Sequence, residues 1–237
     1  MTAPTTSGTY AFAPSLADLI IAAFGRCQIR RPALTVEHLQ DAAMACNLLQ
    51  VEWANKQVNL WTVDLQSIPL VQGTATYNVD EATIMIMASY IETTVGGVAN
   101  DRIIISIDRD TYASFPDKTT QGMPTVYWYD KQIAPTITVW QPPDGATTYT
   151  LKFYRARQIQ DASLPSGLHA EVPYYFLEAY VAALAAKLGE LYAPDQLGRL
   201  MPMAKVAWDD AANRNVENSP LRIVPAMGTY VSSIYRG

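Results

Sequence analysis

The chain has 237 residues, of which 49% are hydrophobic and only 16% are charged, and its formal net charge is −5. This length and hydrophobic content exclude an intrinsically disordered chain and allow one large domain or two small ones. The negative charge argues against a general nucleic-acid binder, because neutralising phosphates requires clustered lysine and arginine side chains.

The first 60 residues predict an arm followed by a pair of helices. Residues 1–14 are small and polar and contain proline, which is typical of an arm. Ser15 and Asp18 form a capping-box-like start for a helix whose apolar residues recur at helical spacing. Thr35 is a good N-cap for a second, longer helix, which should end near residues 56–59.

The hydrophobic period then changes from helical spacing to alternation, and residues 61–157 predict an antiparallel β insertion, either one sheet or a small sandwich. A glycine-containing loop at residues 95–101 indicates a hairpin, and residues 142–145 (Pro-Pro-Asp-Gly) are a strong turn signal. Residues 110–121 predict a polar connection with one helical turn. The expected strands lie in segments 62–68, 75–79, 82–94, 102–108, 125–129, 136–141 and 148–155.

A second helix pair is predicted over residues 158–217. Pro173 suits a first helical position and Pro194 opens the next helical segment. Pro202 lies inside that segment, so we expect a kink or a break near Met201. The whole pattern predicts an α+β fold in which the N-terminal and C-terminal helix pairs form one four-helix bundle and the β insertion projects from it.

Residues 218–237 predict an extended C-terminal tail that binds a partner. The segment has two prolines, two glycines, two arginines and no acidic residue, and it is too apolar for a solvated linker. We therefore expect its apolar residues to become buried on a partner and its arginines to pair with acidic groups there. The candidate binding residues are Leu221, Arg222, Ile223, Val224, Tyr230, Val231, Ile234, Tyr235 and Arg236.

Motifs for catalysis, cofactors or metals are absent from the sequence. Its two histidines, His38 and His169, are too few and too separated for a motif-based metal site, and His38 is expected to face solvent. The two cysteines, Cys27 and Cys46, are interpreted as buried free thiols of a protein assembled in a reducing compartment. No apolar run is long enough to span a bilayer. No catalytic residue, cofactor or metal ligand is assigned.

Carboxylates keep one enzymatic alternative open. A glycoside hydrolase needs two acidic side chains, and Glu178 and Glu190 lie twelve residues apart on a predicted helix, with Asp195, Asp209 and Asp210 on the next. These spacings are ordinary for solvated helix faces. A peptidoglycan hydrolase therefore remains an alternative to a non-catalytic protein.

Aromatic residues gather on the predicted strands, and alternation should turn half of them outward. Large exposed aromatic side chains usually mark interfaces, so Tyr127, Tyr129, Trp140 and Phe153 are candidates for subunit contacts. Stacking of sugars, as in a carbohydrate-binding module, is the alternative. A nucleic-acid-reading sheet would carry more lysine and arginine nearby than this one does.

The order of several short motifs resembles the head-to-tail adaptor proteins of tailed bacteriophages. The resemblance covers most of the chain and is strongest from Trp61 to Arg157. It rests on Trp61-Thr-Val-Asp-Leu, Ile68-Pro-Leu-Val-Gln-Gly, Tyr77-Asn-Val, Asp108-Arg-Asp-Thr-Tyr-Ala, Gly122-Met-Pro-Thr-Val-Tyr-Trp, Ile137-Thr-Val-Trp-Gln-Pro-Pro-Asp and the strand from Tyr149 to Tyr154.

The resemblance implies a structural protein of the virion neck, assembled in the host cytoplasm. Such adaptors are helical bundles with a β insertion, and they form a ring, usually twelve-fold, beneath the portal protein. The C-terminal extension docks on the portal, and the ring presents a platform to the next tail, nozzle or neck protein. Packaged DNA passes through the channel without sequence-specific binding, and no membrane is involved.

Overall fold

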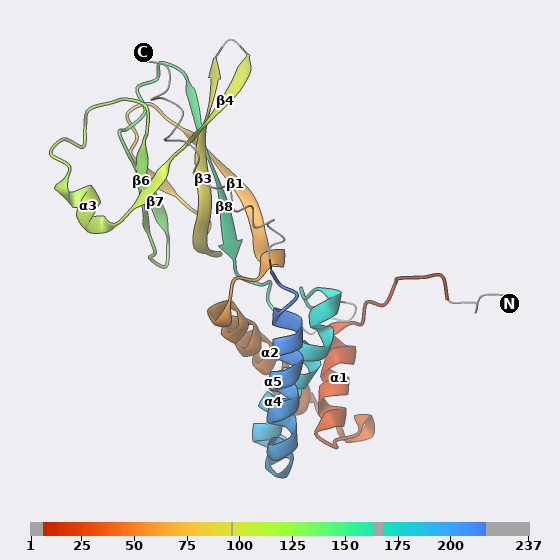
Figure 1. Ribbon diagram of the computed structural model, residues 1–237. Coiled ribbons are helices and arrows are strands. Elements are labelled where there is room, and N and C mark those ends of the chain that lie inside the picture. The colour runs from red at the N-terminus through yellow and green to blue at the C-terminus, as the bar shows by residue number, and fades with distance from the viewer. Residues whose placement is uncertain (1–6, 96, 164–167, 217–237) are drawn as a thin grey trace, which may run out of the picture.

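The computed structural model describes residues 7–95, 97–163 and 168–216, and in this part the protein is an α+β fold with five α-helices and two four-stranded sheets. Figure 1 shows helices α1 (Leu16–Arg26), α2 (Val36–Lys56), α4 (Leu177–Tyr192) and α5 (Leu197–Ala212) at one end and the sheets at the other. Each end has its own hydrophobic core. The order of helix pair, β insertion and helix pair agrees with the sequence pattern.

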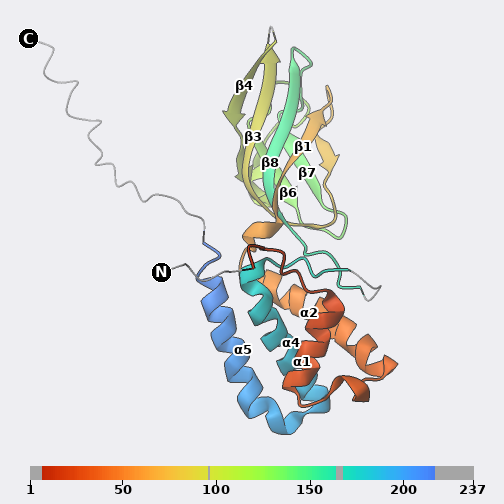
Figure 2. The same cartoon turned by 90° about the vertical axis from the view of Figure 1, so that its right-hand side faces the viewer.

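The helical end consists of four helices around one core. Helix α4 (Leu177–Tyr192) contacts α1 (Leu16–Arg26), α2 (Val36–Lys56) and α5 (Leu197–Ala212). Figure 2 shows α1 and α5 on either side of α4. Short 3-10 turns lie at Arg31–Ala33 (η1), Leu60–Thr62 (η2), Tyr174–Phe176 (η3) and Pro194–Gln196 (η4). The four-helix bundle itself stays a prediction.

Both predicted starts of the N-terminal helices are confirmed, because local side chains satisfy the first backbone N–H groups. The Ser15 hydroxyl accepts from the amide of Asp18 (3.2 Å), and the Asp18 carboxylate accepts from the amide of Ser15 (3.2 Å). Thr35 and His38 form the same reciprocal arrangement at the start of α2. The expectation that His38 faces solvent is wrong, because its ring lies 4.5 Å from the ring of Tyr192 and is half-buried.

Trp53 is the largest buried side chain of the helical core. Its ring lies 5.0 Å from Trp208, 5.4 Å from Phe176 and 5.6 Å from Tyr180, so α2, α4, α5 and the turn before α4 meet around it. Helix α5 runs on through Pro202, and the expected break near Met201 is wrong. Pro202 removes only one backbone hydrogen bond from α5, and packing against α4 stabilises the helix before and after this residue.

The β insertion is a sandwich of two sheets with a core between them. One sheet has the order β1-β8-β3-β4 and the other β2-β7-β6-β5. The strands are β1 (Val63–Leu70), β2 (Thr76–Asn78), β3 (Thr83–Val95), β4 (Val98–Ile103), β5 (Ile105–Ile107), β6 (Val126–Asp130), β7 (Thr136–Trp140) and β8 (Thr148–Arg157). Core residues come from both sheets, among them Leu151 and Phe153 from one and Tyr127 and Ile137 from the other.

One strand pair corrects the expectation of a purely antiparallel insertion. The return strand expected at 102–108 divides at Ile104, whose side chain is buried in the core. Its first part, β4, pairs with β3 as the expected hairpin, whereas β5 crosses to the other sheet and runs parallel to β6. A parallel pair needs a crossover, and the segment that contains α3 (Arg109–Ser114) supplies it.

Candidate functional site

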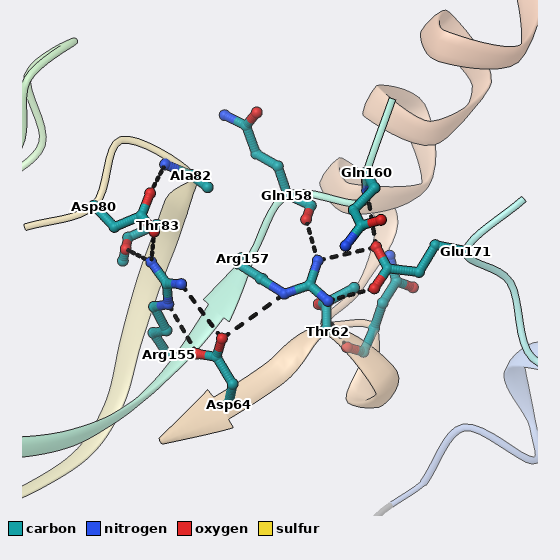
Figure 3. A network of polar contacts seen from close by, with 11 residues as sticks. Thr62, Asp64, Asp80, Ala82, Thr83, Arg155, Arg157, Gln158, Gln160 and Glu171 are labelled. Carbon is teal, nitrogen blue, oxygen red and sulfur yellow. Dashed lines mark hydrogen bonds and ion pairs between the residues drawn. The ribbon is translucent and has the colours of Figure 1, made fainter. Parts of the chain in front are cut away.

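A network of charged side chains joins the sandwich to the helical end (Figure 3). Arg155 on β8 is only 4% exposed, and its Nε lies 2.8 Å from Oδ1 of Asp64 on β1. Its Nη1 lies 3.1 Å from a carboxylate oxygen of Asp80 and donates to the Thr83 hydroxyl (2.8 Å). The hydrogen bonds from Arg155 hold the pKa of Asp64 below its usual value.

Arg157, two residues further along β8, carries the network to the segment before α4. Its Nη1 donates to Oε2 of Glu171 (2.9 Å), and Nη2 bonds to the other oxygen of the same carboxylate. The amide of Gln160 donates to Glu171 as well (2.8 Å), and the Trp61 indole donates to the Glu171 carbonyl oxygen (3.0 Å). The hydrogen bonds from Arg157 lower the pKa of Glu171. Strand β8, η2 and the approach to α4 are thereby held in one arrangement.

The ion pairs of this network stabilise the junction between the sandwich and the helical end. Every carboxylate in it faces an arginine, and a catalytic acid would need a raised pKa instead. Over residues 7–95, 97–163 and 168–216, no three histidine, cysteine, aspartate or glutamate side chains come together as a metal site would require. The buried guanidinium of Arg155 holds β1, β8 and the segment from Asp80 to Thr83 together.

The candidate acid pair on α4 is not brought together. Glu178 accepts two hydrogen bonds from Nη2 of Arg26 (2.8 and 2.7 Å), which is the contact of a surface ion pair. Glu190 lies twelve residues further along the same helix, roughly 18 Å away at the rise of an α-helix. Paired glycosidase carboxylates lie within about 10 Å of each other. Asp195, Asp209 and Asp210 are exposed.

The four aromatic residues proposed for subunit contacts lie largely inside the chain. Tyr127 and Phe153 are 2% and 1% exposed and fill the sandwich core, so the expectation that they face a neighbouring subunit is wrong. The sequence pattern predicts that successive side chains of each strand point to opposite faces of the sheet. It does not predict which of the two faces the second sheet covers. Tyr129 is half-buried and donates from its hydroxyl to the Thr83 carbonyl oxygen (3.1 Å).

Trp140 and its neighbour Trp128 are covered by the segment that contains α3. The ring of Trp140 stacks on Phe115 at 4.3 Å, and its indole N–H donates to the Asp117 carbonyl oxygen (2.8 Å). Trp128 stacks on Tyr112 at 5.8 Å. One face of each of these two rings therefore packs within the chain.

Exposed apolar side chains lie elsewhere, on surfaces that the sequence analysis missed. Met44, Leu48 and Val51 on α2 are 62%, 55% and 59% exposed. On the outer face of the first sheet, exposed Leu65 lies opposite exposed Tyr154 in the register of β1 and β8. Met44, Leu48 and Val51 are spaced i, i+4 and i+7 on the side of α2 opposite to Trp53. This apolar spacing is the sequence signal that would have indicated the exposed surface of α2.

The proposed portal-binding residues Leu221 to Arg236 lie outside the described residues. The last described segment ends beside the junction, where the Asn215 side chain donates to the Val58 carbonyl oxygen (2.9 Å) and accepts from the amide of Leu60 (3.2 Å). The chain therefore leaves the helical end next to the start of β1.

A family model described as SU10 adaptor protein matches residues 14–223, which include all five α-helices and both sheets. The chain belongs to the SU10 adaptor protein family. This confirms the resemblance to phage head-to-tail adaptors that the sequence motifs indicated. No curated protein matches the chain. In the part of this adaptor that the structure describes, no helix has the length and apolar character needed to cross a bilayer.

Proposed function

We propose that this protein is a structural component of a phage virion that forms a ring beneath the portal, extends the DNA channel and presents a platform for the tail. Membership of the SU10 adaptor protein family over residues 14–223 is the observation that carries the proposal. Two features of the described residues support it. Ion pairs such as Arg155–Asp64 hold the sandwich strands in place at the junction. Apolar side chains that could contact other subunits are exposed on both the helices and the sandwich.

We assign the parts of the chain to separate tasks. Residues 1–60 and 158–217 supply a four-helix bundle and residues 61–157 form the β insertion, and these two parts offer separate surfaces to the portal and to the next neck or tail protein. Residues 218–237 anchor the ring by binding the portal. Two separate hydrophobic cores support this division, since each part can keep its own shape while its surface meets a different partner.

Ring formation is tested by the mass of the complex with the portal. We expect several copies of this chain, most simply twelve, to bind one portal assembly, because a protein with only 16% charged residues has surface to bury in subunit contacts. Mass photometry of purified portal mixed with an excess of this protein measures the number of copies. A complex with a single bound copy would contradict the proposal.

The enzymatic alternative makes a separate prediction. Purified protein should leave the turbidity of a peptidoglycan suspension unchanged, because Glu178 is paired with Arg26 and Glu190 lies too far along α4 to act with it. The Glu178→Gln and Glu190→Gln variants are the matched controls. Loss of turbidity with the unmodified protein that disappears in both variants would establish a hydrolase and overturn this part of the proposal.

A further inference from the structure

We propose that Tyr10 of one copy inserts into a pocket of the next copy, between the end of α2 and the sandwich, and that this contact joins the subunits of the ring. The inference rests on the proposed ring and adds to it the side chain and the pocket that meet. The arm comprises residues 7–14, and the junction pocket is the cavity around Asn59.

The junction pocket lies where the end of α2 meets the start of β3 and the end of β8, and it has a volume of about 230 Å³. This volume suits one large side chain, because the sites of whole small-molecule ligands span about 300–1,000 Å³. Ala54, Ile84 and Ala156 provide apolar walls. Asn55 lines the pocket and is exposed to solvent, as is Ile84, so the pocket is open to the surface.

Two buried polar atoms of the junction pocket have no hydrogen-bond partner among the described residues. They are Oδ1 of Asn59, a residue that is only 3% exposed, and Nε2 of Gln57. Asn59 is held in place by its backbone, because its carbonyl oxygen accepts from the amide and from the hydroxyl of Thr62 (2.8 Å each). Buried polar groups are normally hydrogen-bonded, so the pocket is suited to a group that donates to Asn59 and accepts from Gln57.

A tyrosine side chain has the chemistry that the junction pocket requires. Its hydroxyl both donates and accepts, so it can pair with Asn59 and with Gln57 at the same time. Its ring is apolar and covers the walls formed by Ala54, Ile84 and Ala156, which a water molecule would leave uncovered.

Tyr10 is the most exposed tyrosine of the described residues, and its side chain lies wholly in solvent. The residues around it, 7–9 and 11–13, are exposed as well. Tyr174 is the next most exposed tyrosine, but its ring already packs against Phe12 at 6.4 Å. A large aromatic side chain held in water at the end of an arm is typical of an anchor for another subunit.

The arm is fixed at its base and points away from the junction pocket of its own chain. Nδ1 of His169 lies 3.0 Å from the Pro14 carbonyl oxygen, and the amide of Leu16 donates to the Leu168 carbonyl oxygen (2.8 Å). Figure 1 shows the arm leaving the helical end beyond α1, on the flank opposite to α2. In an extended chain Tyr10 lies up to about 14 Å beyond Pro14, which is enough to enter a subunit alongside.

The base of the arm and the junction pocket lie at the same level of the molecule. Arg157 lines the pocket and bonds to Glu171, which is two residues after His169. Copies that stand side by side with their sandwiches at the same end therefore bring the arm of one to the pocket of the next. Such a contact is head-to-tail, and contacts of this kind close into a ring or continue as a filament.

A mixture of two single-cysteine variants tests the contact between copies. Thr9→Cys keeps Tyr10 in place, and Asn55→Cys puts a thiol at the opening of the pocket. The two variants, mixed with portal and treated with a short bismaleimide, should give a covalent dimer on a denaturing gel, whereas neither variant alone should give one. The native thiols do not interfere, because Cys27 and Cys46 are buried and burial raises the pKa of Cys46 to about 11.

The matched control replaces the pocket thiol by one at a distant surface. Val98 is exposed in β4, at the end of the sandwich away from the helices (Figure 1). Thr9→Cys mixed with Val98→Cys should give no covalent dimer under the same conditions.

Truncation of Tyr10 gives the second readout, the protein concentration at which portal is half saturated in mass photometry. Tyr10→Ala should raise this concentration at least about tenfold, because a buried aromatic anchor carries a large share of an interface. Tyr10→Phe keeps the ring but leaves Asn59 and Gln57 unpaired, and it should raise the concentration about fivefold. Thr9→Ala is the matched control in the same exposed arm, and it should assemble like the native protein.

Two results would place the subunit contact elsewhere while leaving the proposed function intact. One is native saturation of portal by Tyr10→Ala. The other is the absence of a covalent dimer from the Thr9→Cys and Asn55→Cys mixture, although the unmodified protein binds portal in many copies. A link within one chain of the double variant, without a dimer from the mixture, would show that the arm enters its own pocket and does not join copies. If the unmodified protein binds portal as a single copy, the proposed function fails and the contact fails with it.

Discussion

Deleting residues 218–237 is expected to abolish binding to the portal while leaving a folded protein. All nine proposed contact residues lie in the deleted segment. Seven of them have apolar side chains, two are arginines, and the segment contains no acidic residue. Burial of those apolar side chains stabilises the complex by about 25 cal/mol per Å² before the cost of ordering the segment. We expect the affinity to fall at least about 100-fold, which corresponds to about 2.7 kcal/mol.

The deletion leaves the described contacts of the chain in place. The core residues of the described part of the chain lie between Leu16 and Ala211, and we expect circular dichroism and the thermal midpoint of the truncated protein to match those of the full chain. Binding is measured by biolayer interferometry on immobilised portal. Replacing Arg222 and Arg236 by glutamine, with the apolar residues kept, separates the charged contribution from the apolar one. Unchanged affinity after the deletion would mean that docking comes from the helical end.

Replacing both carboxylates around Arg155 is expected to give the largest loss of stability among polar substitutions in the chain. In the variant Asp64→Asn with Asp80→Asn, a guanidinium that is 4% exposed keeps the Thr83 hydroxyl but loses both of its ion pairs. Leaving a buried charge without its partners costs about 3 kcal/mol of unfolding free energy. Urea unfolding followed by tryptophan fluorescence measures the loss.

A matched control uses an ion pair of the same strand that remains in contact with water. Lys152 and Glu92 form a pair between β8 and β3, and about a quarter of each side chain is exposed. Glu92→Gln should therefore cost clearly less than the double variant. An equal loss for both variants would show that the burial of Arg155 has no special effect on stability.

Acid should reveal the same network through its pH dependence. The pKa of Asp64 is lowered by the hydrogen bonds from Arg155, and the pKa of Asp80 is lowered by the amide of Ala82 and then by Arg155. A lowered pKa in the folded state stabilises the fold above the unfolded value, about 3.9, and this stabilisation is lost as the pH falls through the folded value. The difference in unfolding free energy between the native protein and the double variant should therefore shrink below about pH 4.

Local sequence determined the helices and most of the strands, because their signals act within a few residues. The Ser15 and Thr35 caps place the starts of α1 and α2 by hydrogen bonds that span three residues. Alternation and turn signals placed the β3–β4 hairpin and the strand β8. The motif order from Trp61 to Arg157 was enough to indicate the adaptor family that the family match confirms.

Tertiary structure alone decided how these elements face one another. The spacing of two residues in a strand shows that Tyr127 and Phe153 alternate with other side chains, but only the second sheet makes their side the buried one. The return strand divides at Ile104 because its first part pairs with β3 in one sheet and its second part pairs with β6 in the other. Arg155 pairs with Asp64 across 91 residues of sequence. Met44, Leu48 and Val51 on α2 are left uncovered because α4 packs on the opposite side of that helix. Contacts between distant segments carry no local sequence signal, and for that reason the candidate surfaces of this adaptor emerged only from the folded chain.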